Sequence, residues 1–230
     1  MIVLVLALPI LLKMKPILLA FSLLLCAATA CATSDTIPDL TKFSDSSVWQ
    51  LYNRAASTVP DHENSVRLDA RSGDGAAWLE GSNFSEGTIE VDLRGANKPG
   101  QSFIGIAFRG VNDTTFDAIY FRPFNFQNTD VSRRKRSVQY ISQLDHPWEK
   151  LRAESPGKYE AAPSPVPDPD GWFHTRIIVE GNKVSVYVND ATEPSLVVDA
   201  LSERRSGVIG LWVGNGSSGD FANLKITPKN

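Results

Sequence analysis

Short runs in which apolar and polar residues alternate one by one constrain the fold of this chain more than any other feature. The clearest run is Thr88–Arg94, where Ile89, Val91 and Leu93 are separated by other residues that are mostly charged. A period of two places the apolar side chains on one face of a β-strand and the polar ones on the other. From about Asp39 onward, similar runs follow at close spacing with no sustained period of 3.6 residues, which predicts an all-β domain.

The expected strands are separated by Gly, Asn, Asp or Pro. They are Ser65–Ala70, Ala76–Glu80, Thr88–Arg94, Ser102–Arg109, Asp117–Phe124, Ser137–Ser142, Trp172–Glu180, Lys183–Asn189, Leu196–Ala200, Val208–Val213 and Phe221–Thr227. Gly181-Asn182 suits a hairpin turn, and Pro147–Glu154 suits a short helix that Pro opens. Residues 162–170 hold four prolines and are expected to form a loop. We therefore predict a two-sheet antiparallel jelly-roll sandwich with one short helix.

The first 32 residues differ from the rest because they are mostly apolar. We predict that residues 1–32 are a signal peptide, with Met14 as an alternative start. Ala28-Thr29-Ala30-Cys31 resembles a lipobox, so Cys31 is a candidate lipid anchor, and cleavage by ordinary signal peptidase is the alternative. A single membrane anchor through both apolar runs is disfavoured, because lysines inside a membrane are costly. Residues 33–230 are then expected to form one sandwich domain.

Charge and cysteine content restrict the partners and the location. The formal net charge is −3, which does not suit a nucleic-acid-binding protein. The only two cysteines, Cys26 and Cys31, lie in the expected signal segment, so the mature domain has no disulfide. We predict an exported protein, either periplasmic, an outer-membrane lipoprotein or extracellular. Membrane contact is expected only through the anchor, and the oligomeric state is left open.

Several segments from about Gly87 to the end carry a family resemblance. They are Gly87–Arg94, Phe103–Arg109, Asp117–Phe126, Val138–Ser142, Trp172–His174, Val188-Asn189 and Gly210–Gly216. In these segments the chain resembles the bacterial 3-keto-disaccharide hydrolase family of the concanavalin A-like lectin/glucanase superfamily. The resemblance implies a jelly-roll fold and a carbohydrate ligand on one sheet surface.

Strand parity places candidate ligand-binding side chains on one outward face. Gly105 and Ala107 leave room above the sheet, with Arg109 at its edge, and Tyr120 and Arg122 are expected to face the same way. A sugar ring stacks on an aromatic ring, while its hydroxyls bond planar polar groups. We predict ligand contacts by Arg109, Tyr120, Arg122, Asn125, Gln139, His146, Trp148 and Trp212. The alternative is that the aromatic residues pack under loops and the arginines form surface ion pairs.

No catalytic residue is predicted. Glu90 and Asp92 share one strand face, but the residues after them lack the second Glu of a Glu-x-Asp-x-x-Glu glucanase strand. A solvated strand face is therefore the preferred interpretation of this pair. The basic run Arg133–Arg136 is interpreted as an exposed loop, with a rim that attracts an acidic sugar or phosphate as the alternative.

Metal binding has little support in the sequence. The three histidines, His62, His146 and His174, are scattered, which does not suit zinc. Asn112-Asp113 and Asp117 offer a weak set of calcium ligands, for which a hairpin turn is the alternative. We predict no cofactor.

Three functions from different classes stay open. The first is an exported carbohydrate-binding sandwich that acts on extracellular or periplasmic glycans. The second is a glycoside hydrolase or lyase that uses groups among Arg109, Arg122, Gln139, His146 and Glu149. The third is a laminin-G-like protein-interaction module.

Overall fold

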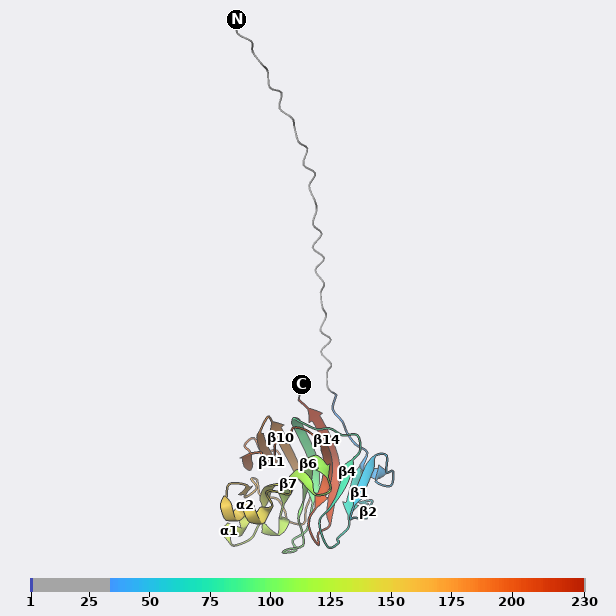
Figure 1. The fold of residues 1–230 in the computed structure, drawn as a ribbon. Helices are drawn as coiled ribbons and strands as arrows, with labels where there is room; N and C mark the ends of the chain where they lie inside the picture. The colour runs from blue at the N-terminus through green and yellow to red at the C-terminus, as the bar shows by residue number, and fades with distance from the viewer. Residues whose placement is uncertain (2–33, 230) are drawn as a thin grey trace. The chain divides into compact units, whose positions relative to one another are not determined.

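The computed structural model describes Met1 and residues 34–229 (Figure 1). The expected signal-peptide cleavage sites and Cys31 lie outside the described residues, and those expectations stay predictions. Every strand from residue 34 onward belongs to one of two seven-stranded sheets, in which all pairings between strands are antiparallel. The predicted two-sheet sandwich is therefore confirmed.

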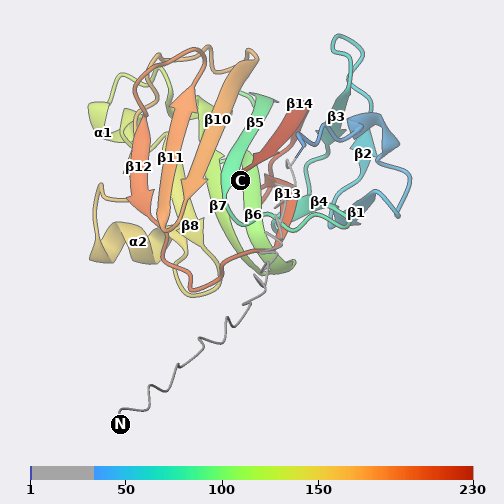
Figure 2. The same ribbon diagram turned by 90° about the horizontal axis from the view of Figure 1, so that it is seen from above.

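The two sheets lie face to face, as Figure 2 shows. Sheet 1 has the order β1 (Trp49–Tyr52), β4 (Gly75–Leu79), β13 (Val208–Val213), β6 (Ile104–Asn112), β7 (Thr115–Phe121), β8 (Val138–Ser142) and β9 (Glu160–Ala161). Sheet 2 has the order β12 (Leu196–Asp199), β11 (Lys183–Val188), β10 (Phe173–Glu180), β5 (Gly87–Arg94), β14 (Gly219–Pro228), β3 (Ser65–Leu68) and β2 (Ala56–Ser57). All eleven expected strands overlap an observed one.

The space between the sheets holds the core that the alternation predicts. Ile89, Val91 and Leu93 of β5 are fully buried, as are Ile104 and Ile106 of β6. Burial of a large apolar side chain stabilises a fold by about 1.5–3 kcal/mol. With no cysteine between residues 34 and 229, this apolar contact replaces disulfides as the source of stability.

Short helices occupy the connections on both sides of β8. The expected helix is present as α2 (Trp148–Glu154), and its N-cap is Pro147. A second helix, α1 (Val131–Arg134), was not predicted; Asp130 caps it by accepting a hydrogen bond from the backbone N–H of Ser132. Two 3₁₀ turns, η1 (Leu40–Lys42) and η2 (Pro123–Asn125), complete the helical segments of the described chain. No helix among the described residues is long and apolar enough to cross a membrane.

Arg109 points the opposite way from its predicted direction. Where β6 pairs with β13, one extra residue of β6 stands between Ala107 and Gly110, and the backbone φ of Arg109 is 51°. Such a bulge adds a residue to one strand and reverses the parity of the residues after it. The Nη2 of Arg109 therefore donates to the carbonyl oxygens of Ser85 at 3.1 Å and Gly181 at 2.9 Å, and so joins the two sheets.

Candidate functional site

A cleft of about 520 Å³ lies on the outer face of sheet 1. Strand register positions two of its lining residues, Tyr120 and Trp212, because a row of paired residues runs across the sheet on this face. The row contains Tyr52, Ala76, Trp212, Gly105, Tyr120 and Gln139. The lining residues are Asp74, Gly100, Phe103, Tyr120, Ile141, Gln143, Pro147, Trp148, Glu149, Trp212, Gly214 and Asn215.

Four aromatic residues line the cleft; Trp148 is 38% exposed, whereas Tyr120 and Trp212 are almost fully buried. The rings of Tyr120 and Trp212 are 5.1 Å apart, and Phe103 meets Tyr120 edge-on at 6.2 Å. Gly105 lies in the row between Tyr120 and Trp212. A Cβ atom at Gly105 would come within 2.0 Å of the carbonyl oxygen of Ile119, so only glycine permits β6 and β7 to approach this closely. The indole Nε1 of Trp212 is buried and has no hydrogen-bond partner in the described part of the chain.

Two carboxyl groups line the same cleft. Asp74 precedes β4, and Glu149 lies in the first turn of α2. Burial raises the pKa of Asp74 above its ordinary value, and the negative charge of Glu149 acts in the same direction. A hydrogen bond from the backbone of Asn215 and the charge of Arg54 oppose that rise. A carboxyl group with a raised pKa in a cleft is typical of ligand-binding and catalytic sites.

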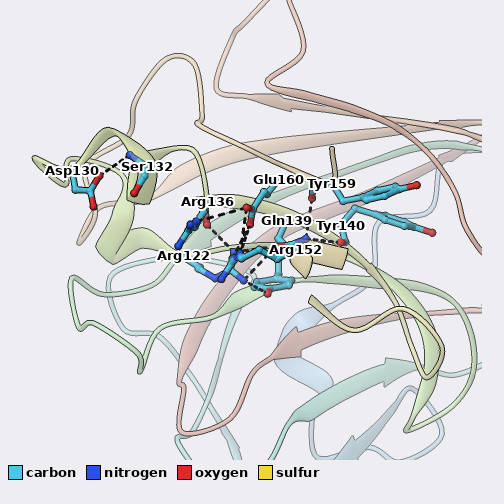
Figure 3. A network of polar contacts seen from close by, with 10 residues as sticks. Arg122, Asp130, Ser132, Arg136, Gln139, Tyr140, Arg152, Tyr159 and Glu160 are labelled. Atoms are coloured by element: carbon cyan, nitrogen blue, oxygen red, sulfur yellow. Dashed lines mark hydrogen bonds and ion pairs between the residues drawn. The ribbon is translucent and has the colours of Figure 1, made fainter. Parts of the chain in front are cut away.

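Arg122 follows β7 and is 4% exposed. Its Nη2 donates to the hydroxyl of Tyr120, and its Nη1 donates to the carbonyl oxygen of Arg136 at 2.7 Å (Figure 3). Burial raises the pKa of Tyr120 to about 12, so the phenol stays protonated at neutral pH. Burial also lowers the pKa of Arg122, although a guanidinium stays charged in proteins.

The structure brings some of the predicted ligand-binding residues together and separates others. Tyr120, Trp148 and Trp212 line the cleft, while Arg122 and Asn125 line a smaller pocket beside it. Whether any of them contacts a ligand stays a prediction.

The other predicted residues have different surroundings. The Nε2 of Gln139 donates to the carbonyl oxygens of Tyr140 and Tyr159, and its Oε1 accepts from Arg122 at 3.4 Å. His146 closes a tight turn by exchanging backbone hydrogen bonds with Ser142 and lines neither the cleft nor the pocket. Arg109 lies between the sheets, where it bonds the carbonyl oxygens of Ser85 and Gly181.

Sequence reasoning missed most of the polar lining of the cleft. Asp74 stands in a Ser-Gly-Asp-Gly segment typical of a turn, and Asn215 lies in a similar segment after β13. Only the long-range pairing of β4 with β13 brings these two loops to one end of the cleft. Glu149 was named only as a candidate of the alternative enzyme function. No local signal marks Asp74 or Asn215.

The candidate groups of sheet 2 lie on its outer face, away from the cleft. The Nδ1 of His174 lies 2.8 Å from a carboxylate oxygen of Asp92, and its Nε2 lies 3.6 Å from Glu90. The hydrogen bond with Asp92 raises the pKa of His174. These side chains are part of a charged surface that water reaches.

The residues considered for calcium do not converge. Asn112 accepts a hydrogen bond from the backbone N–H of Thr114 within the β6–β7 turn. Asp113 accepts one from the indole of Trp78, and Asp117 is fully buried against Arg204 at 2.6 Å. In residues 34–229, no group of three or more His, Cys, Asp or Glu side chains is placed to hold a metal ion.

The sequence of this chain matches a protein-family model. The model described as the 3-keto-alpha-glucoside-1,2-lyase-like domain matches residues 39–227. This match includes all the strands of both sheets except the last residue of β14, and it confirms the predicted resemblance. No curated protein sequence matches the chain significantly.

Solved structures share the fold at low sequence identity. The carbohydrate-binding module CBM66 from Bacillus subtilis is 16% identical, with 78% of this chain and 96% of that chain covered and a TM-score of 0.55. The β-glucanase of Bacillus licheniformis is 14% identical, with 86% and 99% covered and a TM-score of 0.55. The exoplasmic/lumenal domain of VIP36, bound to Ca²⁺ and mannose, is 13% identical, with 84% and 88% covered and a TM-score of 0.53. At these identities the likeness establishes the fold alone.

Proposed function

Because the chain belongs to the 3-keto-alpha-glucoside-1,2-lyase-like domain family, we propose that it binds a carbohydrate in the cleft of sheet 1. The observation that carries this proposal is a cleft of about 520 Å³ lined by four aromatic rings, of which that of Trp148 is 38% exposed. We also propose that the protein is exported, on the strength of the expected signal peptide, and that its ligands are extracellular or periplasmic glycans.

The cleft has the two kinds of surface that a sugar requires. The C–H face of a pyranose ring is apolar and packs on aromatic rings such as Phe103 and Trp148, which line the cleft and are only partly buried. Its hydroxyl groups need hydrogen-bonding partners, which Asp74, Gln143 and Asn215 supply at the margins. A volume of about 520 Å³ lies in the usual range for small-molecule sites.

A glycan array followed by calorimetric titration tests this proposal. Trp148→Ala removes a ring that is 38% exposed and lines the cleft, so the fold need not change. We expect affinity for the bound glycan to fall about tenfold, as for truncation of an aromatic contact residue. The matched control is Trp172→Ala, which removes a half-buried indole stacked on Arg94 beside sheet 2. Equal affinities for the two variants would contradict the location of the site.

A second candidate function is cleavage of a 3-keto-glucoside by elimination. The observation in its favour is Asp74, a carboxyl group in the cleft with a raised pKa. The C3 carbonyl of such a sugar acidifies the proton on C2, which the Asp74 carboxylate would accept. The C2–H electron pair then forms the C1=C2 bond while the C1–O1 bond breaks, and O1 leaves with a proton from water. A base whose pKa lies closer to neutrality suits this transfer.

Turnover of a synthetic 3-keto-glucoside, followed by NMR, separates binding from cleavage. We expect Asp74→Asn to abolish release of the aglycone and to retain affinity for the substrate, because the amide keeps the shape of the side chain. Release at an unchanged rate in Asp74→Asn would exclude Asp74 as the base. Binding without release by the wild-type protein would leave the first function alone.

A further inference from the structure

A second pocket, of about 240 Å³, adjoins the cleft and shares Phe103 and Trp148 with it. Four of its eight lining residues are arginines: Arg122, Arg133, Arg136 and Arg152. No aspartate or glutamate is among them. We call this site the arginine pocket. The cleft, in contrast, is lined by Asp74 and Glu149 and by no basic residue.

The carboxylates around the arginine pocket do not balance its four positive charges. Arg152 and Arg136 share Glu160, at 2.7 Å and 3.8 Å (Figure 3). Arg133 lies 3.9 Å from Asp130, and that pair is exposed to solvent. Arg122 has no carboxylate within 4.0 Å in the described part of the chain. The four guanidinium groups therefore have only two carboxylates within 4.0 Å in the described part of the chain.

Arg122, the arginine without a carboxylate partner, is fixed by several hydrogen bonds. It donates to the Tyr120 hydroxyl, to the carbonyl oxygen of Arg136 and, at 3.4 Å, to the Oε1 of Gln139, but to no carboxylate among the described residues. Its guanidinium lies over the ring of Tyr120 at 4.8 Å and over that of Trp148 at 5.7 Å. Burial of a cation is costly unless an anion or several hydrogen bonds compensate it. A desolvated guanidinium in a fixed orientation binds a carboxylate or sulfate group with little further loss of entropy.

We propose that the arginine pocket binds an anionic substituent, a carboxylate or a sulfate, of the sugar whose ring occupies the cleft. This inference rests on the proposed carbohydrate binding. The inference predicts that the ligand is an acidic sugar. It also predicts the orientation of that sugar. Asp74 and Glu149 repel an anion from the cleft, so the charged substituent lies beyond Trp148 and the uncharged ring stays in the cleft.

The test is calorimetric titration of the purified full-length protein with matched sugars. The pairs are methyl glucoside with methyl glucuronide, and methyl galactoside with methyl galacturonide; glucose 6-sulfate and galactose 6-sulfate distinguish sulfate from carboxylate. We expect at least one acidic sugar to bind about tenfold more tightly than its neutral partner, which is the size of a charge-assisted contact. That preference should shrink as NaCl rises from 0.02 to 0.5 M, values chosen because screening lengths shorten from roughly 20 Å to about 4 Å over this span.

Variants in one segment of chain supply a matched comparison. Arg133→Gln and Arg136→Gln each remove a charge that lines the pocket, and Lys135→Gln removes one from an exposed residue between them. We expect the first two to lower affinity for the acidic sugar about threefold to tenfold. All three variants should bind the neutral sugar as the wild type does, which also reports that they are folded.

The outcomes separate this inference from the function on which it rests. Equal affinity for neutral and acidic sugars, unchanged by salt, would overturn the anionic subsite and leave the carbohydrate cleft standing. Equal losses in Lys135→Gln and Arg136→Gln would mean that only general charge attraction operates, which also overturns it. Absence of binding to every sugar on the array and in the titrations would overturn the proposed function itself.

Discussion

The strands of both sheets alternate their side chains between two faces, yet the outer face of sheet 2 is partly exposed and that of sheet 1 is mostly buried. On sheet 2, β5 and β10 alternate strictly between buried and half-exposed residues. Their outward side chains include Glu90, Asp92 and His174, which pair with one another in contact with water. On sheet 1, every residue of β8 is buried, as are all those of β7 except Thr115. The outward side chains there include Tyr120 and Gln139.

The difference teaches where a sandwich of this kind places its cleft. A strand with one face in solvent must keep polar residues on that face, so its sequence alternates clearly. A strand whose outer face is covered by loops, or is to be covered by a ligand, can carry glycine and aromatic residues there. The strands that alternate least are therefore the ones that build the site.

The largest expected effect is a loss of stability when the close contact between β6 and β7 is disturbed. A Cβ at position 105 would approach the backbone of Ile119 and Tyr120 within 2.5 Å, so we expect Gly105→Ala to lower the free energy of unfolding by about 3 kcal/mol. The counterpart on sheet 2 is Ser185→Ala, at a half-buried position of β11, with a change below about 0.5 kcal/mol. Urea unfolding measures both. Equal midpoints would contradict the described contact between β6 and β7.

A smaller effect is expected on ligand affinity from the aromatic residues of the two faces. Tyr120→Ala removes a ring from the cleft and should weaken glycan binding at least tenfold, because a buried aromatic contact contributes about 2 kcal/mol or more. Tyr187→Ala removes a ring of sheet 2 that stacks on Arg176 at 4.1 Å and should leave affinity unchanged. Calorimetric titration of both variants with a glycan from the array decides the matter. Weaker binding by Tyr187→Ala would place a ligand on sheet 2.

Removal of the Tyr120 hydroxyl alone sharpens the comparison further. Tyr120→Phe keeps the ring but takes away the acceptor for the Nη2 of Arg122. We expect a loss of about threefold to tenfold in affinity for an acidic sugar and little change for a neutral one, because the guanidinium loses part of its orientation. A larger loss for the neutral sugar would mean that the hydroxyl contacts the ring directly.

The smallest effect belongs to the charged surface of sheet 2 and depends on pH. Because the hydrogen bond with Asp92 raises the pKa of His174 in the folded protein, charged His174 stabilises the fold. That contribution is fully present below the ordinary histidine pKa of about 6.5 and is lost as pH rises through the raised folded value. Water screens this partly exposed pair, so we expect less than about 1 kcal/mol.

Urea unfolding of the wild type and of His174→Gln at pH 5 and pH 9 measures this difference. The variant should be less stable at pH 5 and equal to the wild type at pH 9. Glycan affinity should be the same for both proteins at each pH. A stability gap that widens with pH would mean that the neutral ring, and not the imidazolium, is stabilised.

The sequence was sufficient for the fold because burial follows alternation directly. Ile89, Val91 and Leu93 lie in the core as their spacing predicts. The direction of Arg109 could not be predicted in the same way, since a bulge between Ala107 and Gly110 changes parity without changing composition. Strands β2 and β9 have two residues each, which is too short for a period to show.

The candidate site was predictable only in part. Tyr120, Trp148 and Trp212 could be named because aromatic residues stand out beside glycines and in loops. Asp74 and Asn215 could not, because they meet through pairings between strands far apart in the chain. The ion pairs of Glu160 with Arg136 and Arg152 depend in the same way on the pairing of β9 with β8.

Of the two residues shared by the cleft and the arginine pocket, Trp148 comes from the segment between β8 and β9, which contains α2. Neither sheet depends on this loop for the pairing of its central strands. Replacement of this loop can therefore alter the boundary between the two pockets while the pairing of the central strands is left unchanged. Exchange of this loop between relatives is accordingly a direct route to altered sugar specificity on an unchanged scaffold.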